Sequence, residues 1–407
     1  MRVAAEKHVF LSPWRYPQYR LLWISSLGTY IGRWVETVVI SWLVLELTNS
    51  PFLIGLLGTC RFAGMLMGPF CGAIADRFDR RRILLAAQLI YGIASLILMI
   101  LFLTSQLEVW HLFVFVLVTG LCFSFDFSVR YAVAADIVEG RDLVSAVSLV
   151  YVATGSTSMF GPLIGGGLLQ TVGAYGCFAL VTASFLLSFL VLLRMKITVP
   201  ARQTINESVW KNLIDGLRYV KNDRSLLAMI LMAALANLFV FPYWFTLIPI
   251  FARDILHTEA IGFGQLMAAI GLGVTIGSLA TGSLPDFLKK GKLLIATVIC
   301  WPAVLIVFSF SRLFPLSVVL LILAGTAQGM AMALIQSLLL MWSSKEMRGR
   351  VSGARTFAIG SLPLGNLLAG VGASLLDAPT VLIINNSVSI LATALIAVWA
   401  PKLLQRR

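Results

Sequence analysis

The sequence predicts an all-α integral membrane protein with twelve transmembrane helices in two pseudo-symmetric six-helix bundles. Of its 407 residues, 59% are apolar and only 12% are charged, whereas a soluble domain usually has about a quarter charged residues. Apolar runs of roughly 20 residues, the length that spans a bilayer, recur along the whole chain. Patterns from the first half also return in the second half. Together these features predict a duplicated helical unit in lipid.

The spans are expected in the following order: 22–47, 51–75, 83–103, 109–129, 143–169, 174–193, 225–251, 261–284, 293–310, 313–342, 349–376 and 380–400. Arg33 and Glu36 interrupt the first apolar run, and no cleavage pattern follows it. It is therefore predicted to be a span and not a removable signal peptide.

The net charge of +13 is distributed unevenly about these spans. Almost all Lys and Arg lie in segments on one predicted side; the exceptions are Arg33, Arg61, Arg253 and Arg312. This bias is typical of the cytoplasmic side of a multi-pass protein and of contact with anionic lipid. It predicts cytoplasmic termini in a bacterial inner membrane, and it argues against nucleic acid as a partner.

The second and eighth spans carry glycines at nearly the same spacing, from Gly64 and from Gly273. Gly-Arg and Val-Ser pairs also follow the fourth and the tenth spans. Chance is the alternative, since the chain has 33 glycines, but matched order and location favour two parallel repeats. The expected domains are an N-terminal bundle at 1–193, a cytoplasmic linker at 194–224 and a C-terminal bundle at 225–407.

The linker contains apolar residues at helical spacing from Val209 to Val220. They predict an amphipathic helix that lies on the cytoplasmic membrane face or, alternatively, docks on the protein.

Three ionisable residues fall near the middle of the first two spans, where charge is costly and usually functional. Arg33 and Glu36 are three residues apart and can pair on one helix face, and Arg61 can compete for the same carboxylate. Such a carboxylate can change its pKa between two conformations, as a proton-coupled carrier requires. The alternative is a fixed ion pair that sets packing.

Asp126 is a second candidate for proton or substrate binding. It lies four residues before Arg130, toward the cytoplasmic end of the fourth span. A pair on the surface side of this helix is the favoured alternative.

Uncharged polar and aromatic residues of the seventh and tenth spans are candidates for the cavity lining, because transporters bind substrates near the midplane between their repeats. They are Asn237, Tyr243, Trp244, Gln328 and Gln336. An apolar aromatic pocket with few polar groups suits an amphipathic organic molecule. Tyr243 and Trp244 can equally be interfacial anchors.

No chemistry of another class is indicated by the sequence. The five cysteines lie inside predicted spans without metal-ligand spacing, and no nucleotide-binding loop or facing Ser/His pair occurs. We therefore expect no cofactor, no metal and no enzymatic activity.

A basic turn separates the second and third spans and reads GAIADRFDRRR over 72–82. It resembles the G-x-x-x-D-R-x-G-R-R loop of the major facilitator superfamily, with Asp79 in place of the usual glycine. The matching residues are Gly72, Asp76, Arg77, Arg80 and Arg81. The resemblance implies a conformational latch in which Asp76 caps the eleventh helix, as a carboxylate can. Asp76→Asn is then expected to slow cycling and to leave membrane insertion intact.

The fifth span resembles the closing GPxxGG of the antiporter motif of facilitator-family exporters. The matching residues are Gly161, Pro162, Gly165 and Gly166. The earlier glycines of that motif are missing, and simple helix packing is the alternative. The buried arginine of family drug/proton antiporters is also missing, because Val116 stands four residues before Gly120.

Pro17–Leu22 and Arg348–Ser352 resemble the transmembrane-secretion-effector branch, which includes siderophore and drug exporters. The resemblance implies a monomeric secondary transporter that exports small amphipathic or hydrophobic compounds by alternating access, with proton antiport. The alternative within transporters is a facilitator or importer of a lipid-like or metabolite substrate without proton coupling. A membrane receptor or scaffold that does not transport is the alternative from another class.

Overall fold

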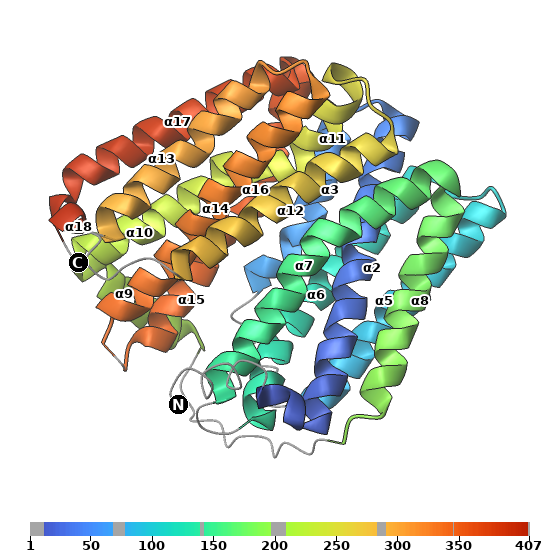
Figure 1. Cartoon of the computed structure of the whole chain (residues 1–407), viewed down its shortest axis with the longest axis horizontal. Helices are drawn as coiled ribbons and strands as arrows, with labels where there is room; N and C mark the ends of the chain where they lie inside the picture. The colour runs from blue at the N-terminus through green and yellow to red at the C-terminus, as the bar shows by residue number, and fades with distance from the viewer. Residues whose placement is uncertain are drawn as a thin grey trace, which may run out of the picture.

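The computed structural model describes residues 12–67, 78–138, 142–196, 209–282, 290–344 and 346–405. In these ranges all regular secondary structure is helical, and the helices form two bundles side by side (Figure 1). Nine helices of the described ranges are long and apolar enough to span a bilayer. Three more helices, α2, α7 and the short α3, complete the expected twelve spans.

The first bundle consists of α2 (Pro17–Thr48), α3 (Pro51–Phe62) with η2 (Ala63–Met67), α5 (Arg80–Leu103), α6 (Val109–Ile137), α7 (Asp142–Thr171) and α8 (Ala174–Leu193). Two helices are longer than the sequence predicts. The α2 helix begins at Pro17, a residue that suits the first turn because its missing N–H would be unpaired there anyway. The α6 helix continues to Ile137, past the predicted end at 129.

The second bundle begins with one span over Arg224–Ile255. It combines α10 (Arg224–Leu235), α11 (Ile248–Ile250) and the π-helical segments η3 (Ala236–Val240), η4 (Tyr243–Leu247) and η5 (Phe251–Ile255). The other spans are α12 (Ala260–Gly282), α13 (Lys290–Ser309), α14 (Phe314–Trp342), α15 (Arg348–Ile359) with α16 (Leu362–Leu375), and α17 (Ala378–Trp399). The shorter helices are η1 (Ser12–Arg15), α9 (Val209–Asn222) and α18 (Pro401–Gln405).

The repeated glycines perform the same packing task in both bundles. A Cβ on Gly64, in the second span, would lie 2.6 Å from the carbonyl oxygen of Gly120 on α6. A Cβ on Gly273, in the eighth span, would lie 2.8 Å from the amide nitrogen of Thr326 on α14. The second span thus packs on the fourth as the eighth packs on the tenth. Small residues allow this close approach, which drives helix association in lipid.

The two bundles contact each other near the end that is opposite to the chain termini (Figure 1). The α3 helix packs on α16, where a Cβ on Gly55 would lie 2.6 Å from the Cα of Gly370. The α7 helix packs on α12, where a Cβ on Gly166 would lie 2.6 Å from the Ala260 carbonyl oxygen. Arg253 also donates to the Asn49 side chain across this end, at 2.8 Å.

The linker helix α9 docks on the second bundle, which is the second of the two arrangements that the sequence left open. Gly216 of α9 faces the Arg350 backbone of α15, and the Tyr219 hydroxyl accepts from the backbone N–H of Ser344 at 3.2 Å. Asp215 lies 3.6 Å from the Arg350 guanidinium. Val220, at the end of the apolar face, is buried by these contacts, whereas Ile214 is 50% exposed.

The segment before α2 is held on the first turn of α7. Asp142 accepts from the Ser12 hydroxyl at 2.6 Å and pairs with Arg15. The hydrogen bond from Ser12 and the charge of Arg15 lower the pKa of the Asp142 carboxyl. Two further side chains, Tyr19 and Trp23, donate to α7 carbonyl oxygens at 2.7 and 2.9 Å.

Candidate functional site between and within the bundles

A buried ion pair joins the first two spans. The Arg61 guanidinium on α3 donates to Glu36 Oε1 and to Thr37 Oγ1 on α2, each at 2.9 Å. The Glu36 and Arg61 side chains are only 1% and 3% exposed. Of the two arginines that the sequence offered to Glu36, Arg61 is thus its partner, and the predicted pairing of Arg33 with Glu36 is wrong in this conformation.

Two polar atoms of this ion pair lack a hydrogen-bond partner in the described part of the chain. Among the described residues, Glu36 Oε2 and one Arg61 terminal nitrogen have no hydrogen-bond partner. A buried polar atom without a partner destabilises the charged form of the pair. The α6 helix packs closely on α3 at this point: a Cβ on Gly120 would lie only 2.5 Å from the Arg61 carbonyl oxygen.

Arg33 points to α5 and α6. Its guanidinium donates to the Thr119 carbonyl oxygen at 3.3 Å. It lies 4.3 Å from the ring centre of Phe123 and 5.8 Å from that of Tyr91. Only 8% of Arg33 is exposed, and no carboxylate of the described residues is within salt-bridge distance.

Asp126 and Arg130 form a second ion pair within α6, with Arg130 Nε donating to Asp126 Oδ2 at 2.7 Å. Both side chains are completely buried, so the surface location that the sequence favoured is wrong. Gln88 of α5 donates to the other Asp126 oxygen at 3.0 Å. Arg130 also donates to α2 hydroxyls at 2.8–3.1 Å, those of Ser25, Ser26 and Thr29. The longer α6 places this pair in the bundle interior.

The polar residues of the second bundle form an uncharged cluster. The Tyr243 hydroxyl donates to Gln328 Oε1 at 2.7 Å, and the Trp244 indole N–H lies 3.0 Å from the same oxygen. The structure thus brings these three predicted residues together. Asn237 instead donates to the Ala233 carbonyl oxygen at 2.8 Å, and Gln336 is half-buried on α14.

Four aromatic rings meet between the bundles, and we call them the aromatic bridge: Trp34, Phe62, Trp244 and Phe245. Trp34 lies 5.4 Å from Trp244 and 6.3 Å from Phe245, between ring centres, and Phe62 lies 4.7 Å from Phe245. Only Trp244 was among the predicted residues. The sequence does offer one indication of the two first-bundle rings: Trp34 directly follows Arg33, and Phe62 directly follows Arg61.

The basic turn is described only in part, since Gly72, Asp76 and Arg77 lie outside the described residues. Arg80 pairs with Asp136 at the end of α6, and Arg81 donates to the Leu193 carbonyl oxygen at 2.8 Å. Asp79 accepts from the Arg81 backbone N–H at 2.9 Å and caps α5. The aspartate that departs from the usual glycine is therefore a helix N-cap.

The glycines around Pro162 place α7 between the bundles. Gly161 faces the Trp34 side chain, Gly165 faces α2 at Val35, and Gly166 faces α12. The Pro162 carbonyl oxygen lies against Gly264 of α12. These are helix-packing contacts, and a role of this segment in antiport stays a prediction.

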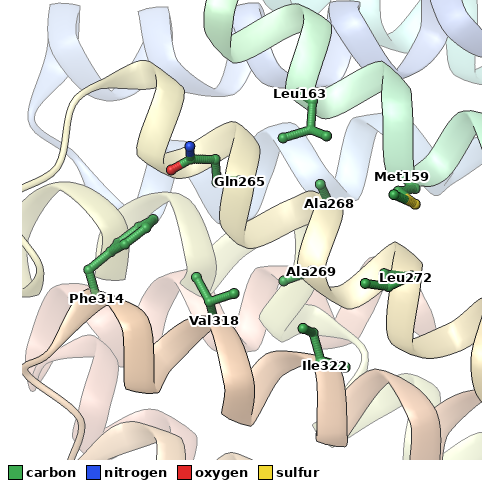
Figure 2. A pocket seen from close by; sticks show the side chains of 9 residues that line it. All are labelled: Met159, Leu163, Gln265, Ala268, Ala269, Leu272, Phe314, Val318 and Ile322. Atoms are coloured by element: carbon green, nitrogen blue, oxygen red, sulfur yellow. The ribbon is translucent and has the colours of Figure 1, made fainter.

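A groove of 360 Å³ lies beside the same contact, between α7, α12 and α14. Figure 2 shows Leu163, Phe314 and Val318 directed into it from two of these helices. Its lining is apolar apart from Gln265.

Comparisons with known proteins agree with this architecture. Residues 9–404 match the family model for the transmembrane secretion effector. The enterobactin exporter EntS of Shigella flexneri is 25% identical over 362 residues, which cover 86% of this chain and 85% of the exporter. Among solved structures, the POT family transporter PepTSo aligns with a TM-score of 0.76 at 13% identity, over 96% of this chain and 99% of that one. The nucleoside transporter NupG aligns with a TM-score of 0.72 at 16% identity, over 94% and 98%.

Proposed function

Since the chain belongs to the transmembrane secretion effector family, we propose that it exports small amphipathic or hydrophobic organic compounds, drug-like or siderophore-like, by proton antiport. The EntS exporters support the direction of transport and a substrate of this kind. We place the protein in a bacterial inner membrane as a monomer, with both termini in the cytoplasm. The positive charges of the terminal side support this orientation.

Alternating access follows from the two bundles. With this orientation, the contacts of α3 with α16 and of α7 with α12 close the outer side, so the arrangement faces the cytoplasm. The moving units are the bundles at 1–193 and 225–407, which segment 194–224 connects. Asp76, with the arginines of its turn, is the proposed latch of the outward-open state, and the expected slow cycling of Asp76→Asn tests it.

The proposal of proton coupling rests on one observation, the buried Glu36–Arg61 ion pair. It joins two helices, and α3 also contacts the other bundle through the hydrogen bond from Thr59 to the Pro363 carbonyl oxygen, 2.9 Å long. Protonation of Glu36 removes the charge that holds Arg61, at a site where both side chains are buried. The proton would therefore loosen α2 from α3 and change the contact with α16.

Asp126 is the weaker candidate for coupling. Both of its oxygens already accept from buried donors, Gln88 and Arg130, so a proton that arrived there would have to displace one of these hydrogen bonds. We assign Asp126 to the stability of the bundle.

The test is the steady-state accumulation of Nile red, a neutral amphipathic dye, in cells that express the wild type, Glu36→Gln or Glu46→Gln. Glu46 lies on the same helix and is exposed, so it is the matched control. We expect several-fold less dye with the wild type and with Glu46→Gln, and a protonophore should restore the dye level. Glu36→Gln should behave like cells without the transporter.

Two results would contradict the proposal. Equal dye in all strains would argue against broad export of amphipathic compounds. Wild-type efflux by Glu36→Gln would remove Glu36 from the coupling mechanism.

A further inference from the structure

One arginine in the interior of the first bundle has no carboxylate partner in the described ranges. Among the described residues, the buried charged side chains of this bundle are Arg33, Arg61, Arg130, Glu36, Asp126 and, at the first turn of α7, Asp142, which pairs with Arg15. Two of the three arginines have a carboxylate partner at 2.9 Å or less. Arg33 is the one that has none, and an isolated charge at membrane depth is energetically costly. Among the described residues, Arg33 is thus the buried arginine of this bundle that an anion from outside the protein could pair with.

The titratable groups around Arg33 do not supply this anion. On its own helix, Glu36 is held by Arg61, and on α6 the oxygens of Asp126 are both occupied. The remaining titratable neighbours are the Cys122 thiol on α6, the Tyr91 phenol on α5 and the Tyr30 phenol on α2, which are neutral in their ordinary ranges. No other described side chain replaces the missing charge.

Arg33 also has unused binding capacity. A guanidinium has five N–H donors in a planar fork that matches a carboxylate. Only one hydrogen bond of Arg33 is made by the described residues, the contact of 3.3 Å with the Thr119 carbonyl oxygen. The neighbouring Tyr91 hydroxyl is completely buried and has no partner among them.

The surroundings of Arg33 indicate an aromatic body for the anion. The Phe123 ring lies 4.3 Å from the guanidinium carbon. The Tyr91 ring on α5 lies 5.8 Å from the same carbon. A molecule whose acidic group reached Arg33 would thus have aromatic faces close by, and stacking favours planar rings.

We propose that the preferred substrates among these amphipathic compounds are aromatic acids, and that Arg33 binds their carboxylate or phenolate group. The inference rests on the proposed function, because it assigns a substrate class to the same transporter. It adds a binding role that is separate from proton coupling by Glu36.

The test compares dansyl-glycine with dansyl-glycinamide, two ligands that differ only by a carboxylate and a neutral amide. Binding to the purified transporter is followed by energy transfer from tryptophan to dansyl. Transport is followed in proteoliposomes with an imposed pH gradient. The variants are Arg33→Gln, Arg33→Lys and, as a matched control, Arg312→Gln, which removes an exposed arginine.

We expect the wild type and Arg312→Gln to bind dansyl-glycine at least tenfold more tightly than dansyl-glycinamide. Arg33→Gln should lose this preference through weaker binding of the acid, with an unchanged Kd for the amide. Arg33→Lys, which keeps the charge and loses the planar fork, should retain part of the preference.

Equal Kd values for the two ligands in the wild type would overturn the inference, and this result depends on no variant. A full preference in folded Arg33→Gln would overturn it as well. The two proposals fail separately. Transport without preference for the acid leaves the exporter standing, whereas preferential binding without transport of either ligand leaves Arg33 as an anion site and removes the export function.

Discussion

The two bundles share one backbone plan but have interiors of different chemistry. The described residues of the first bundle bury three arginines and three carboxylates, whereas the described spans of the second bury no Asp, Glu, Lys or Arg. In their place the second bundle has the neutral cluster of Tyr243, Trp244 and Gln328. The two bundles thus share their helix packing but not their buried polar residues. This difference favours a proton-coupling role for the first bundle and aromatic contacts with the substrate for the second.

The seventh span departs furthest from its repeat partner α2. Three π-helical segments flank Pro242 and Pro249, which cannot donate backbone hydrogen bonds. Short π-helical segments often occur at functional sites, and here η4 carries Tyr243 and Trp244, two of the predicted cavity-lining residues. The same position in α2 is regular helix and carries Arg33 and Glu36.

The largest expected effect distinguishes two ion pairs that involve α6, Asp126–Arg130 and Arg80–Asp136. Asp126→Asn should lower the free energy of unfolding by about 3–5 kcal/mol, because it leaves Arg130 buried without its carboxylate. Asp136→Asn, on the same helix but in an ion pair near the surface, should change it by less than about 1 kcal/mol. Unfolding of purified protein, followed by tryptophan fluorescence, measures both. Equal stability of the two variants would contradict the assignment of Asp126 to bundle stability.

A smaller effect is expected at the contact between the bundles. Gly166→Ala places a Cβ 2.6 Å from the Ala260 carbonyl oxygen, and such overpacking typically costs about 1–3 kcal/mol. The outward-closed arrangement should weaken and Nile red efflux should fall several-fold. Gly167→Ala is the control, because a Cβ there has nothing within 4 Å. Similar efflux in both variants would show that this contact does not limit the cycle.

The smallest effect concerns pH at the docked segment Ser12–Arg15. The pKa of Asp142 is lowered from its usual 3.8, so the ionised form makes the contact. The contact should persist from about pH 8 to pH 5 and weaken only as the pH falls through the lowered pKa. Hydrogen exchange of residues 12–15 should be flat over that range, apart from the intrinsic pH dependence of exchange. Faster exchange already near pH 6 would show that another group holds the segment.

Much of the fold could be predicted from the sequence, because hydropathy is a local property. Apolar runs located the twelve spans, and the glycines after Gly64 and Gly273 identified the repeat and the helices that pack closely. The ends of α2 and α6 were missed. Trp23 donates to α7, and the hydroxyls of Ser25 and Ser26 accept from Arg130, so the polar residues near these ends are satisfied inside the bundle.

The sequence could predict which residues belong to the candidate site, but not which of them contact each other. Their types identified Arg33, Glu36, Arg61 and Asp126 as unusual at membrane depth. Spacing within one helix then suggested Arg33 as the partner of Glu36, and it suggested a surface position for Asp126. Both failed, because a partner on a neighbouring helix is invisible to spacing along the chain.

By itself, the sequence determined that the chain is a duplicated helical membrane protein with costly charges in its first half. Lipid requires long apolar helices and penalises each buried charge wherever the helices lie. Only the tertiary structure decided that Arg61 binds Glu36, that Asp126 is hydrogen-bonded at both oxygens and that Arg33 has no carboxylate partner among the described residues. Those pairings depend on distances of a few ångströms between helices, and such distances are set by packing.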